Sequence, residues 1–165
     1  GLTPAGYILP KFILYPFLIF MFTFVSAILS GALVMAGTRG EGLSVGVVLI
    51  TGALLGVQSM NYIFLFLFFG ISTAAPGISV LLVYVVEILM SSVADALGVD
   101  KYFPHTLTNF ATVMVEFHGA PLPDGFIGQA AVTVALALFS CAALMLLTLF
   151  VIVAKKNDNT ADEIY

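Results

Sequence analysis

Four apolar stretches separated by short polar segments most constrain what this chain can fold into. They cover about residues 12–36, 43–69, 77–97 and 126–154, and each is long enough to cross a hydrocarbon core of about 30 Å as a helix. Backbone groups inside a bilayer must be hydrogen-bonded within the protein, so apolar stretches of this length fold as helices. The sequence therefore predicts an all-α polytopic membrane protein, with about four transmembrane helices in a single membrane domain.

The composition supports this class and excludes others. Of the 165 residues, 61% are hydrophobic and 8% are charged, whereas soluble domains carry about 25% charged residues. The net charge of −4 comes from loops and the terminal tail, so no nucleic-acid partner is expected. The single cysteine, Cys141, excludes an internal disulfide and a thiolate metal cluster. His105 and His118 flank a short segment, which argues against a pair of haem ligands from facing spans. We expect no catalytic, cofactor-binding or metal-binding residue in this chain.

Within the third apolar stretch, the run of residues 78–95 carries a carboxylate in its middle. Glu87 is preceded by Tyr84 and followed by Ser91 and Asp95, and this spacing places all four residues on one side of a helix. A carboxylate in a transmembrane helix is costly unless it faces protein or water. The four residues are therefore candidates for a proton path through the membrane. The alternative is that Glu87 is paired with a neighbouring subunit.

The second apolar stretch contains features of helix packing. Gly52 and Gly56 form a small-xxx-small face of the kind that lets membrane helices approach closely. The polar residues Gln58–Asn61 indicate either hydrated surface or hydrogen bonds between helices. A run of this length must tilt, extend beyond the hydrocarbon core, or break near these polar residues. We interpret the following aromatic block, Tyr62–Phe69, as a lipid-facing or interlocking helix end.

Three segments outside the spans have distinct expectations. Residues 1–11 contain two prolines and two glycines, so we expect no regular helix there. Residues 106–118 are predicted to form a helix too short to cross the bilayer, lying in the interface or against the bundle. The polar tail, residues 155–165, is predicted to be disordered or bound to a partner.

Four spans place both termini on the same side of the membrane. That side carries Lys11, Lys155 and Lys156, whereas the other side carries Arg39 and Lys101. Because basic residues concentrate on the cytoplasmic or matrix side, both termini are predicted to lie there.

Three short motifs occur in the order seen in a known family. They are Ser30-Gly31-Ala32, then Arg39 followed by Leu43-Ser44-Val45, then Val83-Tyr84-Val85 in the third stretch. In order and spacing, residues 24–97 resemble NADH dehydrogenase subunit 6, called NuoJ in bacteria, from the membrane arm of respiratory complex I. The chain differs from the family pattern in lacking a turn proline and in having four expected spans where the family usually has five.

The resemblance implies a role in the proton translocation that complex I couples to quinone reduction. The partners would be the other membrane-arm subunits and the bilayer of the mitochondrial inner membrane or, alternatively, the bacterial plasma membrane. FMN, iron–sulfur clusters and ubiquinone would be bound by other subunits. In the family, the third helix switches between a regular form and one with a π-bulge, and Tyr84 is the functional position carried over. Val86 replaces the flexible glycine of the family, so we expect a smaller rearrangement here.

A second interpretation assigns no proton path to the chain. It would then be a structural supernumerary subunit of a mitochondrial respiratory-chain complex, with Glu87 paired to an Arg or Lys of another chain. Composition and periodicity fit both interpretations, and the motif order favours the first.

Overall fold

The structure is a computed structural model that describes residues 4–37, 43–73, 75–116 and 121–162. Five α-helices make up most of these residues, and no strand occurs among them: α1 (Pro4–Gly37), α2 (Val45–Thr73), α3 (Pro76–Ala96), α4 (Leu107–Glu116) and α5 (Phe126–Asp162). Within α1, α2, α3 and α5 lie segments long and apolar enough to cross a membrane. The predicted all-α membrane protein with four spans is confirmed.

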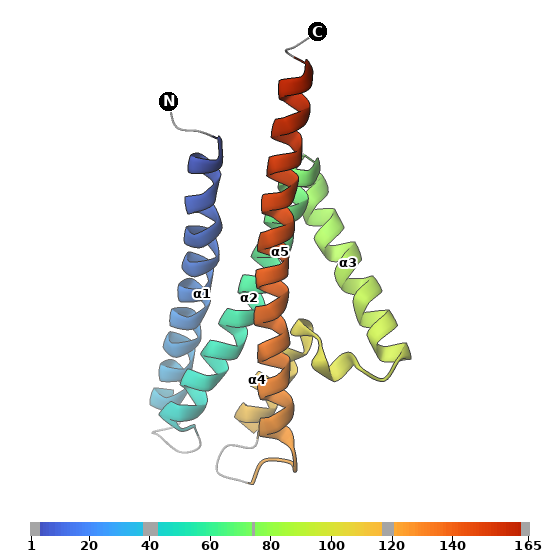
Figure 1. Cartoon of the computed structure of the whole chain (residues 1–165). Coiled ribbons are helices and arrows are strands. Elements are labelled where there is room, and N and C mark those ends of the chain that lie inside the picture. Colours follow the sequence, from blue (N-terminus) through green and yellow to red (C-terminus); the bar gives the residue numbers. More distant parts are fainter. Residues whose placement is uncertain (1–3, 38–42, 74, 117–120, 163–165) are drawn as a thin grey trace.

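Helix α2 is the centre of the bundle, since it packs against each of the other four helices. Figure 1 shows α1 and α5 on either side of it, with α3 leaning away from the bundle after the turn that joins it to α2. The start of α1 and the end of α5 lie at the same end of the molecule (Figure 1). This arrangement agrees with four crossings, while the side on which the termini lie stays a prediction.

The first helix starts earlier than predicted. The expectation that residues 1–11 form no regular helix is wrong from Pro4 onward, because α1 begins there and contains Pro10 and Pro16. A proline at the first helical position loses no hydrogen bond that the helix could make. Each internal proline removes one backbone bond, a loss that membrane helices tolerate. Residues 1–3 lie outside the described part of the chain.

The last helix ends later than predicted. Helix α5 continues to Asp162, so most of the polar tail 155–165 is helical instead of disordered; residues 163–165 are not described. A helix already formed in the membrane extends without a new nucleation step, which explains how polar residues join it. Helix α2 likewise runs unbroken through Gln58–Asn61. At 1.5 Å per residue its 29 residues span roughly 43 Å, so it tilts or extends beyond the hydrocarbon core.

A short segment re-enters the bundle between α3 and α5. Helix α3 ends in a Schellman motif in which Gly98 has a φ of 68°, with Gly98 N–H donating to Asp95 and Val99 N–H to Ala94. Two 3-10 turns, Asp100–Tyr102 and Pro104–Thr106, then lead into α4. We call residues 98–116 the re-entrant segment.

The re-entrant segment reaches the middle of the bundle. Leu107 is fully buried, and it belongs to an apolar core with Leu54 of α2 and Ala137 of α5. The Thr108 hydroxyl donates to Oε1 of Gln58 at 2.6 Å, near the midpoint of α2. Of the two predicted locations for this short helix, membrane interface or bundle, the structure shows the bundle. The end of the predicted range, residues 117 and 118, is not described.

Candidate functional site

One turn of α2 is hydrogen-bonded to all four other helices. We call its residues 58–62 the polar belt. Toward α1, the Thr23 hydroxyl donates to Ser59 Oγ at 3.2 Å. Toward α5, Asn61 Nδ2 donates to the Ala137 carbonyl at 3.4 Å. For Gln58–Asn61, the structure therefore shows the second of the two expected roles, hydrogen bonding between helices.

Toward α3 and α4, the polar belt forms a hydrogen-bonded chain. The Thr108 hydroxyl donates to Gln58 Oε1 at 2.6 Å, and Gln58 Nε2 donates to the Tyr62 oxygen at 3.3 Å. The Tyr62 hydroxyl in turn donates to Oε1 of Glu87. Gln58 and Tyr62 are four residues apart, so they are neighbours on the same face of α2. Because the Tyr62 oxygen accepts from Gln58, the phenolic hydrogen is left to point at the carboxylate.

Glu87 and Tyr62 line a cavity of about 400 Å³ between α2, α3, α5 and the re-entrant segment. We call it the Glu87 cavity. Its polar lining residues are Asn61, Tyr62, Glu87, Tyr102, His105 and Ser140. The volume is many times the roughly 10–15 Å³ that one water molecule needs, and the polar groups offer the partners that water requires. Glu87 is the acidic residue of this lining, and its carboxylate accepts from the Tyr62 hydroxyl.

Helix α3 keeps the four residues predicted to share a proton path on one side, but their surroundings differ. Glu87 lines the cavity, whereas Tyr84 is 62% exposed, and Asp95 is exposed as well. Ser91 is partly buried but does not line the cavity. The inward face of helix α3 carries Ser79 and Ala94, which are fully buried. Glu87, which is partly buried, lies at the edge of this face.

Sequence reasoning missed Tyr62, the residue that hydrogen-bonds Glu87. It was grouped with the apolar aromatic block that follows it. A signal was present, because Tyr62 is the one residue of Tyr62–Phe69 with a hydroxyl, and it follows Gln58 by one helical turn.

Helix α3 is α-helical from Pro76 to Ala96, with no π-bulge.

The two glycines predicted to pack helices both face α1. A Cβ built on Gly56 would lie 2.7 Å from ring carbons of Phe20, and one on Gly52 would lie 3.1 Å from Phe24. The two phenylalanine rings stack on each other, with centroids 5.9 Å apart. On the opposite helix, a Cβ on Gly31 would lie 2.5 Å from Val48. Small residues therefore set the close approach of α1 and α2.

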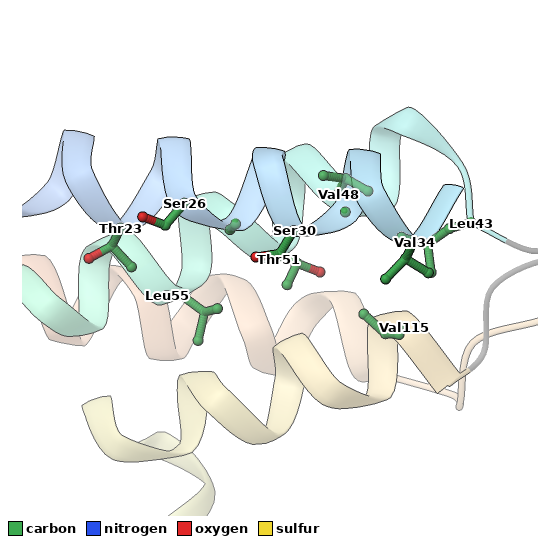
Figure 2. Close-up of a pocket in the computed structure, with 11 residues that line it drawn as sticks. Thr23, Ser26, Ser30, Val34, Leu43, Val48, Thr51, Leu55 and Val115 are labelled. Carbon is green, nitrogen blue, oxygen red and sulfur yellow. The ribbon is translucent and has the colours of Figure 1, made fainter. Parts of the chain in front are cut away.

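A second cavity, of about 420 Å³, lies between α1, α2 and α4. Figure 2 shows its hydroxyl residues Thr23, Ser26 and Ser30 along α1 and Thr51 on α2. The Thr51 hydroxyl is buried without a hydrogen-bond partner among the described residues. No titratable side chain lines this cavity, so the Glu87 cavity is the better candidate for proton chemistry.

Within the described residues, no group of three or more His, Cys, Asp or Glu side chains is placed to hold a metal ion. Cys141 is buried and receives a weak hydrogen bond from Asn61, at 3.7 Å. Comparisons with protein families, with curated proteins and with solved structures found no match to this chain.

Proposed function

We propose that this chain is a membrane-arm subunit of respiratory complex I that takes part in proton translocation coupled to quinone reduction. The observation that carries the proposal is the position of Glu87, a carboxylate in a transmembrane helix that faces a cavity with several polar lining residues and accepts from Tyr62. The motif order of residues 24–97 supports the choice of complex. The membrane would be the mitochondrial inner membrane, or else a bacterial plasma membrane, and FMN, iron–sulfur clusters and ubiquinone would lie on other subunits.

The geometry assigns different roles to the members of the hydrogen-bonded chain. Glu87 is the group that exchanges a proton with water in the cavity. Tyr62 holds one carboxylate oxygen and leaves the other for that exchange. An amide does not pass protons readily, so Gln58 and Thr108 orient the phenol and do not conduct. Thr108 of the re-entrant segment thereby helps to position Glu87 through Gln58 and Tyr62.

The exposed surface supports membership of a larger membrane assembly. Helices α1 and α3 present large apolar side chains outward, including Phe22, Leu33 and Leu81. Tyr84 and Asp95 add exposed polar groups along α3. Lipid covers apolar side chains well but satisfies polar ones poorly inside the hydrocarbon core. Contact with other subunits along α3 explains both kinds of residue.

A structural role without a proton path is the second candidate, and the polar belt is the observation that favours it. Its hydrogen bonds hold α2 against every other helix, and Tyr62 already provides Glu87 with a donor inside the chain. In this alternative, Glu87 would serve assembly alone.

Proton counting in an assembled Glu87→Gln variant distinguishes the two candidates. The amide keeps the size and most hydrogen bonding of the carboxylate but does not titrate. We expect the complex to assemble and oxidise NADH while moving fewer protons per NADH. The matched control is Ser59→Ala, which removes a hydrogen bond from the same turn of α2 and should leave the ratio unchanged. An unchanged ratio in Glu87→Gln, with less assembled complex, would favour the structural role.

A further inference from the structure

We propose that the Glu87 cavity is also a binding site for a lipophilic organic cation, such as an aryl-substituted ammonium. This inference concerns the cavity itself and does not depend on membership of complex I. It combines three properties of the lining: an acidic side chain whose hydrogen-bond donor, Tyr62, is uncharged, aromatic walls, and a position deep in the bundle.

The charge comes from Glu87. One of its oxygens accepts from Tyr62, and the carboxylate still lines the cavity. The donor that the structure shows for this carboxylate, the Tyr62 phenol, is uncharged. Lys101 is the cationic residue of the re-entrant segment, and its Nζ lies over the Tyr102 ring, 5.3 Å from the centroid. A carboxylate in this environment is attractive to a cation that can reach it without a large hydration cost.

The walls favour a cation that is bulky and weakly hydrated. Tyr62, Tyr102 and Phe103 line the cavity. Aromatic faces attract ammonium groups, most strongly where water is excluded. Tyr102 already engages the Lys101 ammonium in this way. The rings offered to a ligand are then Tyr62 and Phe103, of which Phe103 also contacts His105 with ring centroids 6.1 Å apart. Apolar residues such as Val86 and Met90 complete the lining and suit an aryl group.

The place of the cavity in the fold defines the route of entry. Its lining includes Leu136 and Ser140, which lie ten and fourteen residues after the start of α5 at Phe126. At 1.5 Å per residue this is roughly 15–21 Å along the helix, about half of a 30 Å hydrocarbon core. Met90 and Leu136 of this lining are 43% and 44% exposed, so the cavity reaches the outer surface of the helices, where a lipophilic ligand can enter from the bilayer. The volume of about 400 Å³ falls within the range of small-molecule sites.

The test compares a cation with its neutral isostere. Benzyltrimethylammonium and neopentylbenzene have the same shape, with N⁺ in one replaced by carbon in the other. Binding of each is measured by equilibrium dialysis to the protein isolated in mild non-ionic detergent, together with the subunits that copurify. We expect the cation to bind about tenfold more tightly than the neutral compound, the gain of one charge-assisted contact with cation–π support. Equal binding of the two compounds would overturn the proposal.

Two variants attribute the preference to this cavity. Glu87→Gln should reduce the cation preference to within about threefold, because the pocket keeps its shape without the charge. Met90→Trp should weaken binding of both compounds, because the larger side chain fills the cavity while Glu87 stays ionisable. A cation preference that survives in both variants would place the site elsewhere and refute the inference. Binding is read without turnover, so its failure leaves the proton-path proposal to its own test.

Discussion

Helix α2 meets α1 and α3 in two different ways. Against α1 the contact is one of shape, in which Gly52 and Gly56 receive the stacked rings of Phe20 and Phe24. Against α3, which leans away, a hydrogen bond to Glu87 joins the helices beside an open cavity. At Gly52 and Gly56 the contact is filled, and the cavity of about 420 Å³ farther along α1 and α2 has no titratable side chain in its lining, whereas the cavity on the α3 side lies beside Glu87.

The two interfaces should therefore fail in different ways when they are altered. Added volume is costly in the α1 interface, since overpacking a filled contact costs roughly 1–3 kcal/mol, occasionally more. Lost polarity is costly in the α3 interface, since a hydrogen bond to a charged group contributes about 1.5–3 kcal/mol. Stability measurements of matched variants test this difference between the two interfaces.

The largest effect is expected for Gly56→Leu. Even a methyl group at this position would lie 2.7 Å from the Phe20 ring, so a full side chain must push α1 away. We expect a loss of about 3 kcal/mol or more in the free energy of unfolding, measured by denaturant titration in detergent. The same change at Gly128, where a Cβ would meet nothing within 4 Å, is the control and should cost little. Equal losses at both positions would contradict a shape-defined α1 interface.

A double-mutant cycle on Tyr62→Phe and Glu87→Leu should show the next largest effect. Tyr62→Phe alone leaves the carboxylate without its donor, whereas the double variant removes both groups. We expect a coupling free energy of about 1.5–3 kcal/mol. The matched pair across α1 is Thr23→Val with Ser59→Ala, whose neutral hydrogen bond should couple by only about 0.5–1.5 kcal/mol. If the neutral pair couples as strongly as the charged pair, the contrast between the interfaces is lost.

The sequence allowed the contact with α1 to be anticipated far better than the contact with α3. Span number follows from apolar length, and the Gly52/Gly56 face is a spacing within one helix. Both signals are local. The Tyr62–Glu87 hydrogen bond joins residues 25 apart in sequence on different helices, and which phenol meets the carboxylate depends on the angle at which α3 leaves α2. Periodicity within α3 pointed to Tyr84, a residue that the fold leaves exposed.

The errors at the helix ends have the same origin. Prolines in residues 1–11 and polar residues after 155 lower helix propensity, and propensity was the only criterion that the sequence offered there. In the structure both segments continue helices that are already formed within the membrane span, so no new nucleation step is needed. The depth of the re-entrant segment was equally beyond local signals, because it is fixed by the contact of Thr108 with Gln58, fifty residues away.

The smallest effect on stability is expected for Lys155→Met. Lys155 lies on α5 and contacts the end of α2, close to the turn that leads into α3. Lys155 donates from Nζ to the carbonyls of Ile71 at 2.7 Å and Ser72 at 3.0 Å, in the last turn of α2. A cation there satisfies carbonyls that the helix leaves free and complements the helix dipole. Because Lys155 is exposed, we expect Lys155→Met to cost only about 0.5–1 kcal/mol, with Lys155→Arg close to neutral.

The informative measurement for Lys155→Met is local. Hydrogen exchange should accelerate at residues 71–73 and at the first turn of α3, while amides near Gly31 and Gly52 in the α1 interface keep their protection. This pattern would show that the α3 side of α2 opens independently of the α1 side, as expected if one interface is held by shape and the other by a few polar contacts. Faster exchange throughout both interfaces would instead show that they open as one unit. The α1 and α3 interfaces would then differ in geometry but not in local stability.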